Sequence, residues 1–276
     1  MNQAYIESIV QRALEEDLPD ITSAAIFDPG EEGRARFLSK ADGVLAGLPV
    51  AEAVFRAIDS KSRFKAQKRD GDRVSVGDVV AEVEASVVAL LAGERTALNF
   101  LQRASGIATM TRRFVDAVAG TRARIYDTRK TVPGLRLFDK YAVVAGGGEN
   151  HRIGLYDMVL IKNNHVDRSG SITAAVGRVR SKPEPHAVMI EVRSIAELEE
   201  SLPLHPDYIL LDNMDTATMR AAVLRTAGAI PLEASGGVTL GTVRKIAETG
   251  VDRISVGSLT HSVTALDISM RIESAR

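Results

Sequence analysis

The chain has 276 residues, of which 45% are hydrophobic and 26% charged, and its formal net charge is −1. This composition is typical of a globular protein with a substantial core, and it excludes a global basic field that would attract nucleic acid or anionic membranes. The absence of cysteine excludes disulfides, thiolate metal sites and a cysteine nucleophile.

The N-terminal residues predict an amphipathic helix rather than a secretion signal. Between Asn2 and Leu14, the apolar residues Ile6, Ile9 and Val10 recur at helical spacing. Acidic residues come early, which is atypical of signal sequences. No apolar run approaches the ~20 residues needed to span a bilayer. We therefore expect a cytoplasmic protein without a membrane partner.

The next hundred residues predict a small sheet followed by a long helix. Residues 33–83 contain short β-rich runs separated by Asp-Gly and Gly-Asp turns, which favours an antiparallel sheet. Residues 50–58 between these runs predict a helix. Residues 87–119 then predict a long helical region, with a break or kink at Ser105-Gly106.

Beyond residue 120, short apolar strands alternate with helical segments. The predicted strands lie at 123–128, 157–162, 187–192, 207–212, 230–235 and 253–257. This alternation predicts a parallel sheet covered by helices. The strand spacing of roughly 20–30 residues suits the repeated units of an α/β barrel.

Nearly every predicted strand ends in a residue capable of chemistry. These ends carry Asp127 to Lys130, Lys162, Glu191, Asp212, Glu233 with Ser235, and Gly257 with Ser258. In parallel α/β folds the carboxyl ends of the strands converge on one face, where active sites are built. The repetition favours a shared site over a solvated rim.

The cations at these ends point to a small polyanionic ligand. Arg129 and Lys130 are adjacent, and His151-Arg152 precede Lys162 by ten residues. A solvated basic turn at 129–130 and a structural role for His151 remain alternatives. Lys162 follows a strongly apolar strand, so it needs an anionic partner or a lowered pKa.

Glu191 and Asp212 have the opposite charge, and each ends an apolar strand. Two carboxylates beside a cationic pocket suggest Mg²⁺ shared with substrate phosphates. General acid–base chemistry and a salt bridge to nearby cations are the alternatives.

Two small-residue loops predict a phosphate site. Residues 233–238 (EASGGV) and 254–261 (ISVGSLTH) follow the last two predicted strands and expose backbone N–H groups before a helix. Barrels commonly bind phosphate at these two loops. We expect Gly146-Gly147-Gly148 to form a tight, close-packed turn after a helix instead.

Taken together, these motifs closely resemble the quinolinate phosphoribosyltransferase family. The resemblance covers almost the whole chain, through GERTALNFLQRASGIAT, DTRKTVPGLRLFDKYAV, GGGENHRIGLYDMVLIKNNH, LLDNM, EASGGV and ISVGSLTHS. It implies an N-terminal open α/β sandwich over 1–106, with 262–276 packing back onto it, and an incomplete parallel α/β barrel of about six strands over 107–261. It also implies a homodimer with an active site shared across the interface, and it leaves a higher oligomer open as an alternative.

The resemblance implies an activity and a role for each matching residue. The activity is phosphoribosyl transfer from phosphoribosyl pyrophosphate to quinolinate with decarboxylation, using Mg²⁺ and no organic cofactor. The implied quinolinate contacts are Arg129, His151, Arg152 and Lys162, with Arg95 from the partner subunit. Lys130, Glu191 and Asp212 are the implied catalytic residues, the two carboxylates lying on the Mg²⁺ and ribose side. The implied phosphate contacts are Ser235, Gly236, Gly237, Gly257 and His261.

One strand departs from the family pattern. Acidic residues commonly flank the metal-linked Glu, whereas this chain has Met189 and Arg193 around Glu191. With a period of two these residues face one side of the strand, so we expect Arg193 to alter the acidic lining near the metal.

Two other functions are compatible with the same scaffold. A related paralogue associated with molybdenum transport usually lacks the full DTRKT and NHR motifs, and both are intact here. A non-catalytic sensor of sugar phosphates or pyridine carboxylates would be favoured by loss of the carboxylates, but Glu191 and Asp212 are present.

Overall fold

A computed structural model describes residues 1–183 and 186–273, in which the chain forms two compact units. The first unit comprises Met1–Arg112, Thr131–Gly147 and the C-terminal segment from Leu259. The second comprises Arg113–Lys130 and Gly148–Ser258. The division predicted after residue 106 stays a prediction, and residues 274–276 of its C-terminal segment lie outside the described residues.

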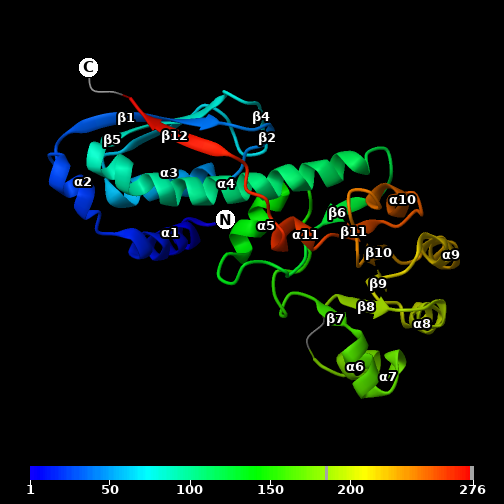
Figure 1. Cartoon of the computed structure of the whole chain (residues 1–276). Coiled ribbons are helices and arrows are strands. Elements are labelled where there is room, and N and C mark those ends of the chain that lie inside the picture. Colours follow the sequence, from blue (N-terminus) through cyan, green and yellow to red (C-terminus); the bar gives the residue numbers. More distant parts are fainter. Residues whose placement is uncertain (184–185, 274–276) are drawn as a thin grey trace. The chain divides into compact units, whose positions relative to one another are not determined.

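The first unit contains the predicted antiparallel sheet (Figure 1). Its strand order is β12-β1-β5-β3, and each neighbouring pair is antiparallel. The strands are β1 (Glu32–Ser39), β3 (Arg63–Ala66), β5 (Val79–Ser86) and β12 (Ile268–Ile272). A separate pair comprises β2 (Gly43–Val44) and β4 (Arg73–Val74). On the central strand, Phe37 lies opposite both Ala81 and Met270, and all three are buried.

The helices of this unit include those predicted from the sequence. They are α1 (Gln3–Asp17), α2 (Ile21–Ile26), α3 (Leu48–Ile58), α4 (Val87–Ala117), α5 (Arg136–Ala145) and α11 (Ser258–His261), of which α4 and α11 each cross a boundary between the units. The apolar residues predicted for the first helix, Ile6, Ile9, Val10 and Leu14, are all buried. Among the described residues, no helix combines the length and hydropathy needed to cross a membrane.

The long helix α4 continues through Ser105-Gly106 without the predicted break. The glycine instead permits close packing. A Cβ at Gly106 would collide with the carbonyl oxygen of Thr264 and would lie 3.0 Å from the Cα of Ala265. Any side chain here would therefore displace the C-terminal segment, which is a reason for glycine that the local sequence does not reveal.

A buried ion pair anchors three segments of the first unit. Arg103 on α4 donates two hydrogen bonds to the fully buried Asp139 on α5, at 3.0 and 2.9 Å. Asp139 also accepts a hydrogen bond from the backbone N–H of Val132, and Arg103 donates to the carbonyl of Thr260. The pair thus holds two further segments in place. One is the start of the loop that precedes α5, and the other is helix α11.

The second unit contains the predicted parallel sheet, with strand order β6-β11-β10-β9-β8-β7. Its strands are β6 (Arg124–Tyr126), β7 (Val159–Ile161), β8 (Val188–Val192), β9 (Tyr208–Asp212), β10 (Leu232–Ser235) and β11 (Arg253–Ser255). All five neighbouring pairs are parallel. Within the described residues β6 and β7 are the two edges and do not pair with each other, so the sheet is open. The prediction of an incomplete six-stranded α/β barrel is confirmed.

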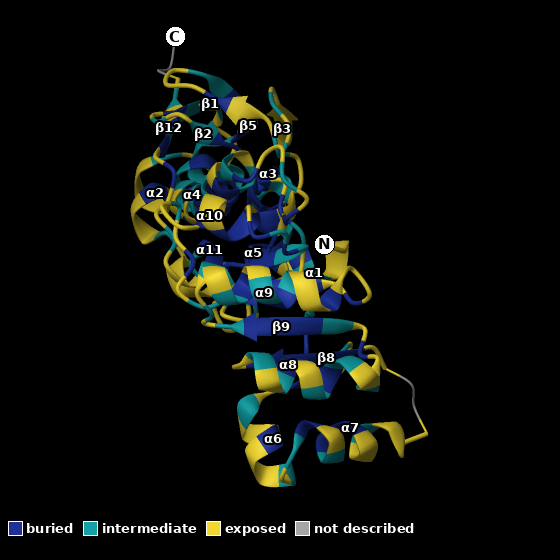
Figure 2. Cartoon of the chain, turned by 90° about the vertical axis from the view of Figure 1, so that its right-hand side faces the viewer, coloured by how far each residue is buried: buried dark blue, intermediate teal, exposed yellow. Residues whose placement is uncertain are grey.

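Helices connect the strands of this sheet, and its strands are buried. The helices are α6 (Asn163–Ser169), α7 (Ile172–Arg180), α8 (Ile195–Ser201), α9 (Thr216–Thr226) and α10 (Val243–Ala247), with a 3₁₀ turn at Leu202–Leu204. Leu160, Met189 and Leu210 form a buried cluster between three adjacent strands. Figure 2 shows β9 as buried along most of its length. Burial on both faces explains the continuous apolar segments in the sequence.

Arg103→Ala is expected to lower the free energy of unfolding by about 3–5 kcal/mol, because it leaves the buried Asp139 carboxylate without its cation. Urea unfolding measures the change. Arg225→Ala is the matched control: it removes an ion pair to Glu199 in which the side chains are 45% and 58% exposed. The control should cost about 0–1 kcal/mol. Equal losses in the two variants would contradict the anchoring role of Arg103.

Candidate active site

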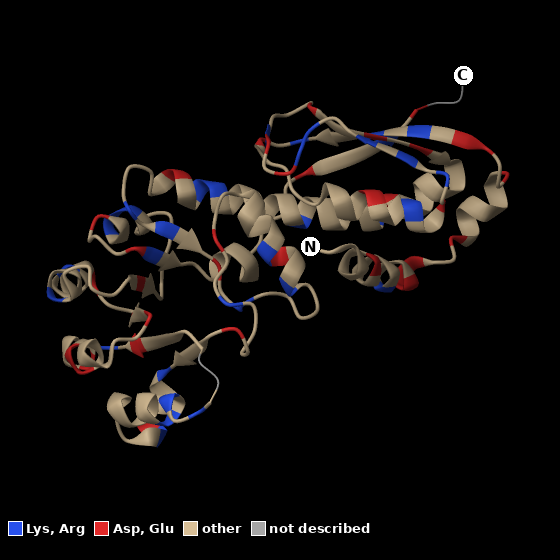
Figure 3. Ribbon diagram, turned by 180° about the vertical axis from the view of Figure 1, so that it is seen from behind, with Lys and Arg blue, Asp and Glu red and all other residues tan. Residues whose placement is uncertain are grey.

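The carboxyl ends of the six parallel strands lie at one edge of the sheet. The strand pairing aligns Asp212 with Ser235, and Ser235 in turn with Ser255. Residues that follow each strand therefore start from neighbouring positions. Charges of both signs are spread over the elements of each unit (Figure 3), so a cationic site must be assembled locally at this edge.

The Gly146-Gly147-Gly148 stretch is a close-packed turn, as predicted. Gly146 ends α5, and Gly147 has a φ of +88°. A Cβ at Gly146 would lie 2.6 Å from the Cβ of Thr111 on α4, and one at Gly147 would collide with the Arg112 guanidinium. Gly146 is therefore required by packing within the first unit, and Gly147 by its left-handed backbone conformation.

The residues after this turn extend the edge of the parallel sheet. Glu149 forms a parallel bridge with Tyr126, and its carbonyl accepts a hydrogen bond from the N–H of Asp127 at 3.1 Å. The fully buried Asp127 carboxylate accepts the N–H of His151 at 2.8 Å. These contacts fix His151 and Arg152 beside the carboxyl end of β6.

The structure brings the guanidinium groups of Arg129 and Arg152 near each other. Arg152 is half-buried, and its Nη1 donates to the carbonyl of Met158 at 2.9 Å. Burial and the positive charge of Arg129 lower the pKa of Arg152, while Asp157 opposes this effect. Arg129 and Lys130 are exposed. An anion bound near Arg152 would counter both of these effects, the burial and the charge of Arg129.

Lys162 has an anionic partner, although its side chain is 51% exposed and could be solvated without one. Its Nζ lies 3.8 Å from Oε2 of Glu191, whose side chain is 11% exposed. Glu191 also accepts a hydrogen bond from the N–H of Asn163 at 3.4 Å. The ends of β7 and β8 are therefore joined by opposite charges.

Arg193 lies just beyond β8, and its charge is balanced by carboxylates other than Glu191. Its guanidinium contacts Glu197 at 2.7 Å and Asp167 at 3.3 Å. These two carboxylates supply local negative charge to Arg193. Met189, the other departure from the family pattern, is fully buried in the core.

The loops after β9 and β10 are interlocked. The Asn213 side-chain amide donates to Asp212 at 3.0 Å, and its backbone N–H donates to the carbonyl of Ser235 at 2.9 Å. Gly236 has a φ of +94°, and a Cβ there would collide with the side chain of Asn213. Gly236 is thus required both by its backbone conformation and by the close approach of Asn213.

The donor set fits a magnesium ion that is completed by substrate. Among the described residues, no group of three or more His, Asp or Glu side chains gathers as a protein-only metal site. Glu191 and Asp212 offer two hard oxygen ligands at the ends of adjacent strands. Mg²⁺ is typically bound by one or two carboxylates together with substrate phosphates and water.

The predicted phosphate-binding residues fall in both units. Ser235, Gly236, Gly237 and Gly257 follow β10 and β11 in the second unit. Helix α11 begins directly after Gly257, whereas α10 begins only at Val243. In the first unit, His261 is exposed at the end of α11, with its Nδ1 2.7 Å from the Ser262 hydroxyl, and Arg95 is exposed on α4.

Sequence reasoning assigned no role to a buried polar cluster beneath this edge. Glu233 is fully buried on β10, and Arg253 on β11 stacks on the rings of Tyr126 and Tyr208 at 4.0 and 4.3 Å. The signal was present in the sequence, since Glu233 stands between Leu232 and Ala234 in an apolar strand. A carboxylate at such a position requires a partner.

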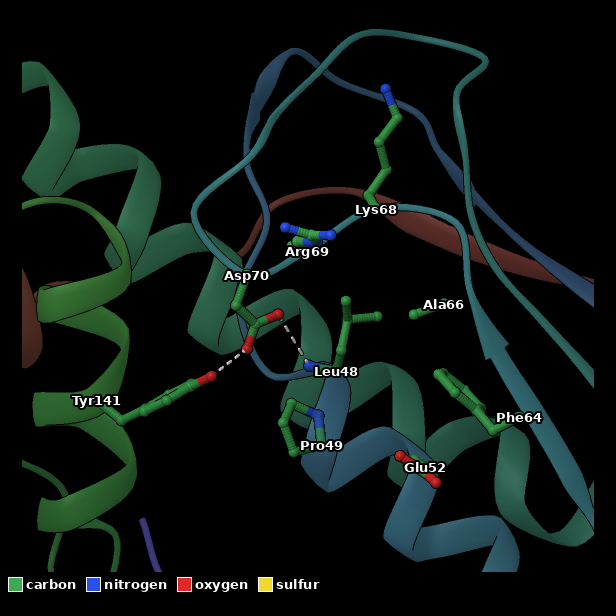
Figure 4. A pocket seen from close by; sticks show the side chains of 9 residues that line it. All are labelled: Leu48, Pro49, Glu52, Phe64, Ala66, Lys68, Arg69, Asp70 and Tyr141. Atoms are coloured by element: carbon green, nitrogen blue, oxygen red, sulfur yellow. Dashed lines mark hydrogen bonds between the residues drawn. The ribbon is translucent and has the colours of Figure 1, made fainter.

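A separate pocket lies in the first unit (Figure 4). Its volume is about 290 Å³, and its lining comprises Leu48, Pro49, Glu52, Phe64, Ala66, Lys68, Arg69, Asp70 and Tyr141. Asp70 accepts hydrogen bonds from the Tyr141 hydroxyl at 2.6 Å and from the backbone N–H groups of Gly47 and Leu48. Burial and Asp70 raise the pKa of Tyr141. These contacts join α5 to the start of α3, and none of the predicted site residues lines the pocket.

Fold and site define a class: an α/β protein with an incomplete parallel barrel and charged side chains at the carboxyl edge of its sheet. Residues 20–105 match the N-terminal domain of quinolinate phosphoribosyl transferase, and residues 107–271 match its C-terminal domain. The chain belongs to the quinolinate phosphoribosyltransferase family.

Individual relatives agree over nearly the full length. A probable nicotinate-nucleotide pyrophosphorylase (carboxylating) from Bacillus subtilis is 43% identical, with 99% of this chain and 95% of the relative covered. A mitochondrial quinolinate phosphoribosyltransferase (decarboxylating) from Nicotiana tabacum is 42% identical, covering 97% of this chain and 82% of the relative. The crystal structure of NadC from Streptococcus pyogenes superposes with a TM-score of 0.95 at 41% identity, covering 98% and 97% of the two chains.

Gly236→Ala is expected to lose about 1–2 kcal/mol of stability from its left-handed backbone, plus a further loss from the collision with Asn213. Gly237→Ala is the control, because Gly237 also has a positive φ but has no atom within 4 Å of an added Cβ. Thermal unfolding of both variants measures the difference. The double variant Gly236→Ala/Asn213→Gly should recover the additional loss, and no recovery would contradict the interlocked arrangement.

Proposed function

We propose that the carboxyl edge of the six-stranded sheet binds quinolinate and phosphoribosyl pyrophosphate side by side and catalyses phosphoribosyl transfer between them. The products are nicotinate mononucleotide, CO₂ and pyrophosphate, which makes the reaction a step of de novo NAD biosynthesis. The observation that carries this proposal is a set of three pairings: Arg129 acts on Arg152, Lys162 pairs with Glu191, and the strand of Glu191 adjoins that of Asp212.

The cations provide the dicarboxylate site. Arg129 and Arg152 are mutually repelling guanidinium groups, and an Arg fork matches a carboxylate in a bidentate manner. Lys162, ten residues after Arg152 in the sequence, supplies a compact third charge. We assign these three groups, with His151, to the two carboxylates of quinolinate. A substrate with a single carboxylate would leave part of this charge unpaired.

The carboxylates and small-residue loops provide the phosphoribosyl site. Glu191 and Asp212 would hold Mg²⁺ and the ribose side, Lys130 would contact the pyrophosphate, and Ser235, Gly236, Gly237, Gly257 and His261 would hold the 5-phosphate. When bound, Mg²⁺ supplies positive charge that neutralises the pyrophosphate leaving group. Lys130 adds a second, fixed charge for the same purpose.

The reaction needs no electron sink from an organic cofactor. The pyridine nitrogen attacks C1 of the ribose, and the C1–oxygen bond to pyrophosphate breaks. The ring becomes a pyridinium, which accepts the electron pair when the bond from C2 to its carboxylate breaks. CO₂ leaves, and a proton then occupies C2. The site cations must bind the substrate dianion without stabilising the departing carboxylate more than the transition state.

The direct test is incubation with quinolinate, phosphoribosyl pyrophosphate and Mg²⁺, with detection of nicotinate mononucleotide and CO₂. We expect both products in equal amounts from the wild-type protein and neither above background from Lys130→Ala. Replacing quinolinate by nicotinate tests whether the second carboxylate is required. A folded wild-type protein that gives no more product than Lys130→Ala would contradict the proposed reaction.

Arg152→Ala is expected to weaken quinolinate binding by about 2–5 kcal/mol, since it removes one partner of a desolvated Arg–carboxylate pair. Isothermal titration with quinolinate and, separately, with phosphoribosyl pyrophosphate measures the effect. The second ligand should bind with nearly unchanged affinity. An equal loss for both ligands would show that Arg152 does not belong to the dicarboxylate site.

We also propose a homodimer in which Arg95 enters the partner's active site. Arg95 is exposed on α4 in the first unit, so its guanidinium is available to a second chain. Closed twofold dimers are the most common symmetric assembly of such chains. Whether dimers assemble further is a separate question for light scattering.

Mixing inactive variants tests the shared site. In a heterodimer of Arg95→Ala and Lys130→Ala chains, one active site combines the intact Lys130 of one subunit with the intact Arg95 of the other. Random reassortment should therefore restore about a quarter of wild-type activity, because half of the dimers carry one complete site. Two inactive variants that stay inactive after verified subunit exchange would contradict sharing.

We place the enzyme in the cytoplasm, also as a proposal. The N-terminal residues form α1, whose apolar face is buried in the first unit. This packing supports a structural role for the segment rather than a targeting role.

A further inference from the structure

Glu233 is a fully buried carboxylate that the reaction described above does not use. It lies on β10, whose neighbours in the sheet are β9 and β11. Burying an ionised carboxylate is unfavourable unless cations and hydrogen-bond donors surround it. The groups around Glu233 therefore indicate what the carboxylate does.

Three side chains surround the two oxygens of Glu233. The Ser255 hydroxyl donates to Oε1 at 2.5 Å, and Nε2 of His151 lies 3.4 Å from the same oxygen. On the other side, Nε of Arg253 lies 3.8 Å from Oε2. The Arg253 guanidinium is held between the Tyr126 and Tyr208 rings. A permanent cation and a hydroxyl donor therefore lie on opposite sides of the Glu233 carboxylate.

The other side of the His151 ring contacts the main chain of its neighbour. Nδ1 accepts a hydrogen bond from the backbone N–H of Arg152 at 2.7 Å. An accepting Nδ1 carries a lone pair, so the proton of the neutral ring is on Nε2. That proton faces the Glu233 carboxylate. The imidazole side chain is only 8% exposed, and both of its nitrogens lie against protein groups.

The backbone of the same pair of residues has a second support. The N–H of His151 is bound by the buried Asp127 carboxylate, and the Arg152 side chain donates to the carbonyl of Met158. The imidazole thus sits between a buried anion and the peptide that carries the Arg152 guanidinium. In the other neutral tautomer, Nδ1 would carry a proton. It would then be a donor facing the N–H donor of Arg152, and this hydrogen bond would be lost.

We propose that Glu233 is a positioning residue that holds His151 in the Nε2-protonated tautomer and, through its Nδ1, fixes the main chain that presents Arg152 to the dicarboxylate substrate. The identity of the substrate in this inference rests on the proposed function, whereas the contacts among Glu233, His151 and Arg152 do not depend on it. It changes the role of His151 given above: both ring nitrogens face protein groups, so the ring acts on the dicarboxylate through Arg152 rather than by a contact of its own. A buried carboxylate that sets an imidazole tautomer is a recurrent device in enzymes.

Glu233→Gln tests this positioning role with almost no change in volume. An amide can accept on only one side, so its NH₂ group would face either Arg253 or the Ser255–His151 side, all of which offer donors. We expect the KM for quinolinate to rise about tenfold or more while kcat and the KM for phosphoribosyl pyrophosphate change less than about threefold. Glu149→Gln is the matched control, because the Glu149 side chain bonds to Arg124 and Tyr126.

A spectroscopic readout separates this inference from the proposed function. The protein has five His residues, and the loss of one set of signals in His151→Asn assigns His151 in long-range ¹H–¹⁵N spectra of the substrate-free protein. The wild type should show the Nε2-protonated tautomer, which Glu233→Gln should lose and Glu149→Gln should keep. An Nδ1-protonated ring in the wild type, or the same tautomer in Glu233→Gln, overturns the inference whether or not the enzyme turns over quinolinate.

Kinetics complete the test. An unchanged quinolinate KM in Glu233→Gln, with an active wild type, also overturns the inference and leaves the proposed reaction intact. If Glu233→Gln does not fold, Ser255→Ala removes one hydrogen bond from the same carboxylate. It should then raise the quinolinate KM in the same direction by a smaller factor, and an unchanged KM would again overturn the inference.

Discussion

Parallel pairing of six strands is the constraint on which the site depends. A parallel sheet places the carboxyl end of every strand at one edge, so residues as far apart in the sequence as Tyr126 and Ser255 become neighbours there. Asp212, Ser235 and Ser255 are aligned across three strands in this way. The bridge between Tyr126 and Glu149 extends the same edge and adds His151 and Arg152. The chemistry follows from this alignment rather than from any single motif.

The electrostatics of the site are local because the protein as a whole is nearly neutral. Two cations at the edge have a defined counterpart: Lys162 faces Glu191, and Arg193 is balanced by Glu197 and Asp167. Arg152 differs from them, because burial and the positive charge of Arg129 outweigh the opposing effect of Asp157 and lower its pKa. A guanidinium group in such surroundings is where an anionic substrate gains the most.

Much of the fold could be predicted from the sequence because its strongest signals are local. All six parallel strands were found as short apolar segments, since strands buried on both faces leave a continuous apolar record. The strand β12 was missed as an element. Its partner β1 lies more than two hundred residues earlier, and such long-range pairing leaves little local pattern. We expected a break or a kink at Ser105-Gly106, and the break was wrong for a similar reason, because the requirement for Gly106 comes from the distant residues Thr264 and Ala265.

The same distinction applies to the site. Lys162 was expected to need an anionic partner, and the structure supplies Glu191. The connection between Glu233 and His151 could not be predicted, because it joins a strand to a loop eighty residues away. The central claim, a dicarboxylate site at the carboxyl edge of the sheet, is tested most directly by a crystal structure with quinolinate bound. We predict both carboxylates within hydrogen-bonding distance of site cations that include Arg152. Quinolinate bound elsewhere, such as in the pocket beside Tyr141, with no contact to Arg152 or Arg129, would contradict the account.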